Sequence, residues 1–276
     1  MNNTLVRKLI LPVAGLGKRL RPLTLRRPKA LVPLAGMPLL SYMLHDAAIS
    51  GINEVIIVAS PQHKKAFTSY IKKNKSKFPA FKKIHLVIQQ KPMGDGHAVL
   101  QALHLFKKEP VAVRFSDDLI LGDHPTVGSL IRFFDHHQAP VLLLERVPKK
   151  YVSRYGIVGI RKTLISQKGF PQGSIHELNT FVEKPRPKDA PSNLSVVGGY
   201  VLTPKFIRHL SHHARMIKGD HNDALRLADV FSAMVARGEK IYGWQFKGSR
   251  LDCGTLEGFY RAEESVRRNR RESLKK

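Results

Sequence analysis

One stretch near the start of the chain, LILPVAGLGKRLRP at residues 9–22, is the clearest indication of the fold. Residues 9–13 form a short apolar run rich in branched side chains, which is typical of a buried strand. Gly15 and Gly17 follow at once, and glycines in such a turn let the backbone come close to a phosphate. A tight strand-to-helix turn also needs glycine, so both interpretations stay open. The turn lacks the Gly-Lys-Ser/Thr ending of a P-loop and the third small residue of a dinucleotide fingerprint.

Outward from this stretch, apolar runs alternate with amphipathic segments. Further runs with the strand pattern lie at residues 55–59, 84–88, 111–115 and 141–144. Segments with helical spacing lie between the first strands, at residues 38–50, 63–73 and 96–106. This alternation predicts an α/β fold with a Rossmann-like, mostly parallel sheet and helices on both faces.

After about residue 145 the pattern changes. Hairpin-like strands are indicated around residues 156–161, 175–182 and 196–202, and they are followed by helices and a last strand at residues 240–247. We therefore expect a partly antiparallel insertion within a single domain that spans residues 1–276.

The composition is that of an ordinary globular protein. With 276 residues, 42% hydrophobic and 25% charged, the chain can bury one sizeable core. No apolar run approaches the roughly 20 residues of a membrane span, and none has the length of a secretory signal. The single cysteine, Cys253, excludes an internal disulfide framework and a cysteine-rich metal site. These features predict a cytoplasmic protein.

The charge of the chain favours anionic partners. Lys and Arg number 47 against 21 Asp and Glu, which gives a formal net charge of +26. Nucleotides, sugar phosphates and nucleic acids would all be attracted, so charge alone does not separate an enzyme from a nucleic-acid binder. Residues 61–83 contain eight lysines and no acid, and residues 261–276 contain seven basic and three acidic residues. A solvated helix face and a basic tail are the simplest interpretations.

Candidate metal ligands follow one predicted strand. The apolar run at residues 111–115 is followed by Ser116, Asp117 and Asp118, and ligands of parallel sheets bind beyond the carboxyl ends of the strands. Mg²⁺ takes oxygen ligands and usually sits on one or two carboxylates together with phosphates and water. Asp117 is therefore the first candidate Mg²⁺ ligand, whereas Asp118 could instead cap a turn. Lys29, in a proline-rich stretch at residues 28–34, could reach phosphate.

Several motifs together resemble a known family. GLGxR at residues 15–19 followed by PKxxxPL at residues 28–34 resembles the signature of the sugar-phosphate nucleotidyltransferases. QQKPMGDGHAV at residues 89–99 resembles the segment that binds the nucleotide base in the bacterial UTP:glucose-1-phosphate uridylyltransferases of that family. Further matches follow in the family's order: YGIV at 155–158, VEKP at 182–185, APSNL at 190–194, GYVL at 199–202 and DCG at 252–254.

The resemblance implies a role for particular residues. A nucleotide-binding half would cover about residues 1–145, and a sugar-binding half with the C-terminal helices about residues 146–276. Nucleotide-binding residues would be Ala14, Gly15, Gly17, Gln89 and Gly94. Sugar-binding residues would be Gly156, Glu183, Lys184 and Gly198. Phosphate charge would be neutralised by Arg19, Lys29 and Lys184, and Mg²⁺ would be held by Asp117 and Asp252.

The reaction implied is nucleotidyl transfer from UTP to glucose 1-phosphate, by Mg²⁺-assisted in-line attack, giving UDP-glucose and pyrophosphate. A glucose-1-phosphate thymidylyltransferase is the main alternative, and a non-catalytic polyanion-binding scaffold is a distant one. Membranes and nucleic acids are not expected as partners, despite the charge. A homo-oligomer, dimer or tetramer, is expected from the family.

The sequence also departs from the family. Lys18 stands where threonine is usual, and Asp95 replaces a common leucine. Residues 224–229, ALRLAD, stand where relatives commonly carry EIQLTD, so Ala224 replaces the usual acid. Sugar choice, helix packing or assembly could differ there.

Glu183 and Lys184 have a simpler interpretation, as no more than a surface ion pair. Pro185 predicts that Lys184 is extended and that the chain bends after it.

Overall fold

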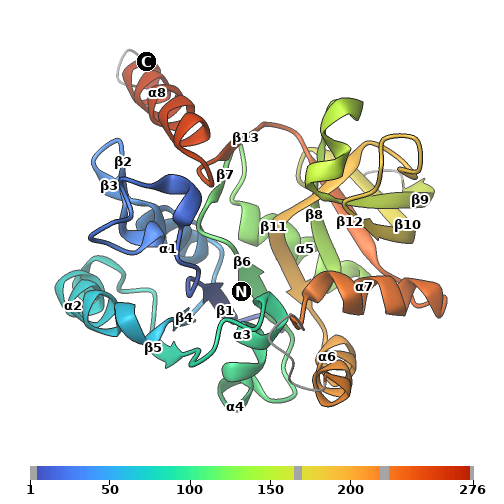
Figure 1. The fold of residues 1–276 in the computed structure, drawn as a ribbon, viewed down its shortest axis with the longest axis horizontal. Helices are drawn as coiled ribbons and strands as arrows, with labels where there is room; N and C mark the ends of the chain where they lie inside the picture. The colour runs from blue at the N-terminus through green and yellow to red at the C-terminus, as the bar shows by residue number, and fades with distance from the viewer. Residues whose placement is uncertain (1–4, 165–169, 218–223, 274–276) are drawn as a thin grey trace.

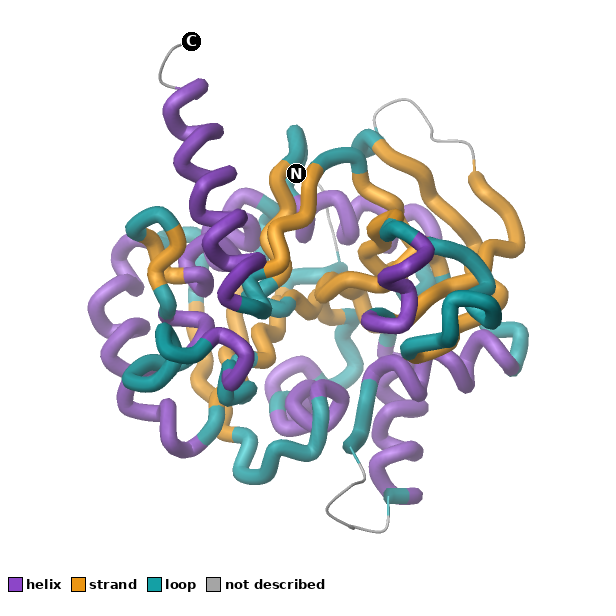
Figure 2. Tube along the Cα trace, turned by 45° about the horizontal axis from the view of Figure 1, so that its top comes forward, coloured by secondary structure: helices purple, strands orange, loops and turns teal. Residues whose placement is uncertain are grey.

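The computed structural model describes residues 5–164, 170–217 and 224–273. Within these residues a nine-stranded mixed sheet runs through the molecule in the order β5-β4-β1-β6-β11-β8-β12-β10-β9. Figure 1 shows the N-terminal strands to the left of β6 and β11 and the later strands to the right. Figure 2 shows the strands in the middle of the molecule with helices around them. The predicted α/β fold class is confirmed.

The N-terminal strands pair in parallel. They are β1 (Lys8–Pro12), β4 (Glu54–Ala59), β5 (Lys83–Ile88) and β6 (Val111–Arg114). Successive side chains point to opposite faces, so Leu9 and Leu11 belong to one hydrophobic cluster and Ile10 to another. Because both faces of β1, β4 and β6 are covered, these strands appear in the sequence as continuous apolar runs, whereas β5 at the edge of the sheet is only partly buried.

The helices lie on both sides of this sheet. Their bounds are α1 (Leu39–Ile49), α2 (Lys64–Asn74), α3 (Asp95–Gln101), α4 (Leu103–Phe106), α5 (Thr126–His137), α6 (Pro204–Met216), α7 (Leu227–Ala236) and α8 (Leu256–Ser273). Short 3-10 turns are η1 (Lys18–Leu20), η2 (Lys29–Leu31), η3 (Pro61–His63), η4 (Lys75–Lys77) and η5 (Lys149–Arg154). The single helix predicted at residues 96–106 is divided at Ala102, whose ψ of −1° ends α3. The helical spacing of apolar residues in the sequence did not predict α5.

The later strands form the partly antiparallel region that the sequence predicted. They are β8 (Val141–Arg146), β9 (Gly156–Leu164), β10 (Gly173–Glu183), β11 (Leu194–Leu202) and β12 (Tyr242–Phe246). β11 runs antiparallel to both β6 and β8, and β10 forms a long antiparallel pair with β9. The pairing of β11 with β6 joins this region to the parallel strands.

A small second sheet, which sequence periodicity did not indicate, crosses between the two regions. In this sheet β7 (Asp118–Leu121) pairs antiparallel with β13 (Ser249–Asp252). A separate two-stranded sheet pairs β2 (Pro33–Leu34) with β3 (Met37–Pro38). From β13 the chain continues into α8, which packs against β13 and β2 and extends from the body at the top of Figure 1. This sheet places Asp252 beside the end of β6.

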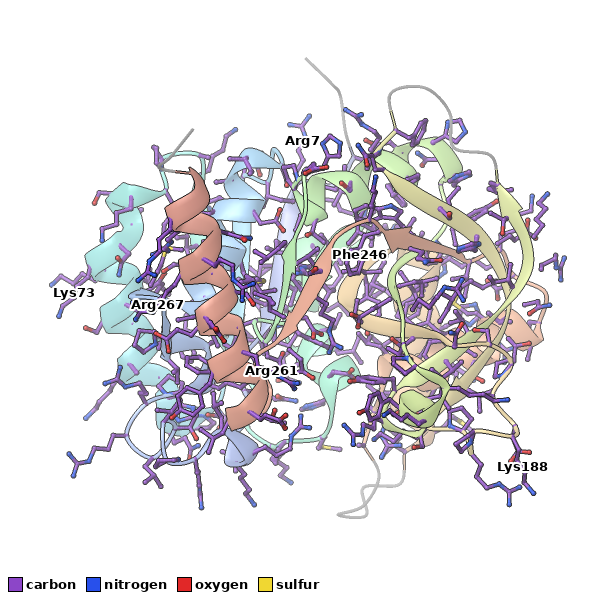
Figure 3. All side chains as sticks on the ribbon, turned by 90° about the horizontal axis from the view of Figure 1, so that it is seen from above. Arg7, Lys73, Lys188, Phe246, Arg261 and Arg267 are labelled. Carbon is purple, nitrogen blue, oxygen red and sulfur yellow. The ribbon has the colours of Figure 1, made fainter. Side chains whose placement is uncertain are left out.

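Much of the positive charge lies on the outer surface. The lysines of residues 61–83 are all exposed, and Figure 3 shows Lys73 on α2 pointing away from the body. Arg261 and Arg267 lie along α8 in the same view. The solvated helix face expected for this lysine-rich stretch is therefore consistent with the structure. None of the helices in the described ranges has the length and apolar character that crossing a membrane requires.

Candidate active site

Among the described residues, two adjoining cavities lie at the carboxyl ends of the parallel strands. The first, the glycine-loop cavity, has a volume of about 450 Å³ and is lined by Gly15, Gly17 and Lys29. The second, the strand-end cavity, has a volume of about 530 Å³ and is lined by Gly156, Glu183, Lys184 and Gly198. Arg19 and Asp117 line both cavities. A ligand in one cavity would therefore meet a ligand in the other beside these two side chains.

The glycine loop is held in place by its own hydrogen bonds. Gly17 has a φ of 62°, in the left-handed region that favours glycine. Its carbonyl oxygen accepts hydrogen bonds from the Thr24 hydroxyl at 2.9 Å and from the Leu20 N–H at 2.9 Å. This turn begins η1 and sends the exposed Arg19 side chain towards both cavities.

Asp117 lies at the end of β6, where the sequence predicted it. Its Oδ2 accepts a hydrogen bond from Nζ of Lys29, and the two groups form a partly buried ion pair. Burial disfavours the charge of Asp117, but the Lys29 ammonium and its hydrogen bond outweigh burial and hold the pKa of this carboxyl below its usual value. The residue is therefore ionised near neutral pH.

Asp252 reaches the same place from a distant part of the sequence. Asp252 pairs with Asp118 in the β13–β7 register, and the Cys253 N–H donates to the Asp117 carbonyl oxygen at 2.8 Å. A Cβ on Gly254 would stand 2.7 Å from Asp252 Oδ1 and 3.5 Å from both Asp117 Oδ2 and Arg19 Nη2. The missing side chain of Gly254 thus leaves a space bordered by both carboxylates.

The donor set of this space fits a magnesium ion. The described residues contain no group of three or more His, Cys, Asp or Glu that could hold a metal. A Mg²⁺ ion here would rest on Asp117 and Asp252 and take its other ligands from phosphate and water, as Mg²⁺ commonly does.

Arg250 is a site residue that the sequence analysis missed. Its guanidinium binds Asp118 at 2.6 Å and Glu145 at 3.1 Å, and it lies 3.6 Å from Asp252. Burial opposes its charge, but these carboxylates outweigh burial and raise the pKa of the guanidinium. Arg250 and Asp252 are two residues apart on β13 and therefore share one face of the strand. Predicting β13 would have revealed the pair.

Asp118 anchors the floor of the strand-end cavity. Its buried carboxylate accepts from the Gly198 N–H at 2.8 Å through Oδ2 and from Arg250 through Oδ1. The fully buried Arg114 donates to the carbonyl oxygens of Asp118 at 2.7 Å and of Gly198 at 3.2 Å. A Cβ on Gly198 would lie 2.6 Å from Asp118 Oδ2, so this anchor itself requires glycine. Asp118 thus has a structural role. Its carboxylate joins β7 to β11 and β13 and does not cap the turn in which it lies.

Glu183 is the last residue of β10, Lys184 follows it, and both line the strand-end cavity. Glu183 pairs with Gly156 in the β10–β9 register, and its Oε1 lies 3.4 Å from Lys184 Nζ. The extended conformation that Pro185 predicts for Lys184 is wrong, because its φ of 49° is in the left-handed region. The Lys184 N–H donates to the Tyr155 carbonyl oxygen at 3.0 Å, and this bond holds the turn. The predicted bend is present, with a different backbone geometry.

Gln89 and Gly94, two of the residues predicted to bind the base, are joined by a hydrogen bond. Nε2 of the buried Gln89 donates to the Gly94 carbonyl oxygen at 3.0 Å and contacts His97 Nδ1 at 2.9 Å. Gly94 has a φ of 96° and lines the strand-end cavity, and a Cβ there would lie 2.4 Å from the Leu225 carbonyl oxygen. Ala14 and Gln89, both described by the structure, line neither cavity. Their predicted contact with uracil stays a prediction.

A larger cavity, of about 790 Å³, lies elsewhere and is lined by Ile49, Ser50, Pro125, Gly128 and Arg132. It contains none of the predicted site residues. Its size alone does not make it the active site, because the converging charged groups lie around Asp117.

Comparison with known proteins agrees with the geometry. The family described as nucleotidyl transferase matches residues 8–269. The UTP–glucose-1-phosphate uridylyltransferase YngB of Bacillus subtilis (strain 168) is 31% identical over 279 residues, covering 95% of this chain and 89% of that protein. A UTP–glucose-1-phosphate uridylyltransferase of Staphylococcus epidermidis is 30% identical over 92% of this chain and 90% of its own length.

Solved structures give the same result. A UDP-glucose pyrophosphorylase complexed with UDP-glucose has a TM-score of 0.81 and 30% identity, covering 96% of this chain and 99% of that chain. A UTP-bound enzyme of the same kind from Acinetobacter baumannii has a TM-score of 0.77 and 26% identity, with 95% and 93% covered. The resemblance read from the motifs is confirmed, and the chain belongs to the nucleotidyl transferase family.

Proposed function

We propose that the chain transfers the uridylyl group of UTP to glucose 1-phosphate, giving UDP-glucose and pyrophosphate. The observation that carries this proposal is the meeting of the glycine-loop cavity and the strand-end cavity at Arg19 and Asp117. The two cavities suit a nucleoside triphosphate and a sugar phosphate that must react at their junction. The names of the relatives support the particular pair of substrates.

The reaction needs no covalent intermediate. A phosphate oxygen of glucose 1-phosphate forms a bond to the α-phosphorus of UTP, the bond from that phosphorus to the bridging oxygen breaks, and pyrophosphate leaves with the electron pair. Burial raises the pKa of the Cys253 thiol to about 12, so the thiol near Asp117 is neutral and is not a nucleophile. Catalysis therefore depends on positioning and on charge neutralisation.

Basic side chains would bring the two anions together. Arg19, exposed at the junction, would bind the triphosphate. Lys29 would also bind the triphosphate, and its ammonium would keep the carboxylate of Asp117 ionised. Lys184, on the wall of the strand-end cavity, would hold the attacking phosphate in line. Asp117 and Asp252 would hold Mg²⁺, which would supply charge neutralisation for the triphosphate.

The remaining predicted contacts divide the chain into two halves. Backbone groups at Ala14, Gly15 and Gly17, with Gln89, would bind the nucleotide in the half up to about residue 145. Gly94 would bind it from the wall of the strand-end cavity. Glu183 would accept hydrogen bonds from sugar hydroxyls, and Gly156 and Gly198 would let the backbone approach the hexose, in the half from about residue 146. A cytoplasmic location and a dimeric or tetrameric assembly belong to the same proposal, and light scattering after size exclusion would measure the assembly.

One assay tests this function. The protein is incubated with Mg²⁺, each of UTP, dTTP, ATP and GTP in turn, and a panel of sugar 1-phosphates, and pyrophosphate release is measured. UTP with glucose 1-phosphate should give the highest kcat/KM. A clear preference for dTTP would instead identify a thymidylyltransferase, and no pyrophosphate from any pair would favour the polyanion-binding scaffold.

A further inference from the structure

Asp95 links two segments that form one wall of the strand-end cavity. It is the first residue of α3, and its Oδ1 accepts hydrogen bonds from the N–H of Gly96 at 2.8 Å and of Leu227 at 3.0 Å. The backbones of the two segments are also joined, because the Leu225 N–H donates to the Met93 carbonyl oxygen at 2.8 Å. The start of α3 and the start of α7 therefore form one unit beside the cavity.

Asp95 is an acidic residue of the strand-end cavity, as Glu183 is. Both residues line it. Burial raises the pKa of Asp95, the hydrogen bonds from the N–H groups of Leu227 and Gly96 counteract part of this rise, and the charge of Glu183 adds a smaller upward contribution. Tyr200, another lining residue, has a pKa raised well above its usual value by burial and by the charges of Asp95, Asp118 and Glu183. The two acids thus line one cavity, Asp95 from α3 and Glu183 from β10.

Aromatic and small side chains form part of the lining of the strand-end cavity, beside its charged residues. Tyr200 stacks on Phe231 with ring centroids 5.6 Å apart, and Phe181 stacks on Phe231 at 6.0 Å, and all three line the cavity. Ala224 and Ala228 on the wall beside Asp95 have side chains too short to fill the space. Carboxylates accept hydrogen bonds from hydroxyls, and apolar side chains on a cavity wall pack against the CH groups of a sugar ring. A cavity with this lining suits a polyhydroxylated ring.

We propose that Asp95 contacts the hexose directly, accepting a hydrogen bond from a ring hydroxyl alongside Glu183, and so helps to determine which hexose 1-phosphate the cavity accepts. This inference rests on the proposed function, since it assigns a contact within the same sugar site. Leucine, which is common at this position in the family that the sequence resembles, could not make the contact, so the specificity would be a property of this chain.

The test compares Asp95→Asn with a matched control. Asparagine keeps an oxygen for the N–H groups of Gly96 and Leu227 and removes the charge. Asp229→Asn removes an exposed charge from the first turn of α7, at a residue that does not line the cavity. Asp95→Asn should raise the KM for glucose 1-phosphate roughly tenfold, as expected for losing a charged hydrogen bond. The KM for UTP should stay within about twofold, and Asp229→Asn should change neither.

Mono-deoxy glucose 1-phosphates separate a direct contact from a structural role. If Asp95 binds one hydroxyl, the wild type should discriminate against the analogue that lacks it, and Asp95→Asn should lose most of that discrimination at this position only. Asp95→Leu, which also removes the oxygen that binds Leu227, should lower the melting temperature and lose the same discrimination.

Two results would overturn the inference. One is unchanged discrimination at every hydroxyl in Asp95→Asn, and the other is an equal rise of both KM values in that variant. Failure of the wild type to use glucose 1-phosphate with any triphosphate would instead overturn the proposed function, so the two failures are distinguishable.

Discussion

Replacing Asp117 with asparagine should remove activity while sparing the fold. The side chains of Asp117 and Lys29 keep 30% and 15% of their exposure, so their ion pair is partly screened and contributes about 1 kcal/mol at most. For a chain of this size that corresponds to a fall in melting temperature of roughly 2–4 °C. The catalytic loss should be larger, because the carboxylate faces the junction where charge accumulates. We expect kcat to fall about a hundredfold or more, or about 2.7 kcal/mol in the barrier.

The assay is pyrophosphate release at saturating UTP, glucose 1-phosphate and Mg²⁺, with thermal unfolding followed by circular dichroism on the same samples. Asp123→Asn is a matched control, since Asp123 is an exposed aspartate just beyond β7 and lines neither site cavity. A folded Asp117→Asn variant with kcat within about threefold of the wild type would refute the reasoning. Undiminished wild-type turnover in excess chelator would refute the magnesium role.

Glu183→Gln should raise the KM for glucose 1-phosphate and spare UTP affinity, because only contacts to sugar hydroxyls weaken, whereas Lys184→Ala should also lower kcat. Titration calorimetry with UTP and kinetics with varied sugar phosphate measure both, and equal weakening of the two ligands would mean that this segment only supports the fold. Lys29→Met should lower the melting temperature most near neutral pH. The lowered pKa of Asp117 means that the ion pair contributes fully above the usual carboxyl value of 3.8 and is lost as the pH falls through the folded value. A difference in melting temperature that does not shrink towards about pH 3 would contradict this.

Local pattern was sufficient for the parallel half of the sheet and for part of the site. The strands around β1 are buried on both faces, so they stand out as apolar runs between amphipathic helices. Asp117 lies three residues beyond the end of β6, and the carboxyl ends of parallel strands meet at one edge, so its place beside the cavities followed from its position in the sequence. The glycine loop likewise follows β1 without a break. In both cases the candidate site residues lie next to a strand whose apolar run is clear in the sequence.

Tertiary structure alone decided which distant residues meet. Asp252 reaches Asp117 because β13 pairs with β7, and each strand has only four residues, too few for a clear alternating pattern. Arg250 went unnoticed for the same reason, although it binds Asp118 across that pairing. The bond from Leu227 to Asp95 joins residues 132 positions apart. Periodicity in a sequence reports which face of an element is buried, whereas the partner on that face is chosen by strand register and by packing of the whole chain.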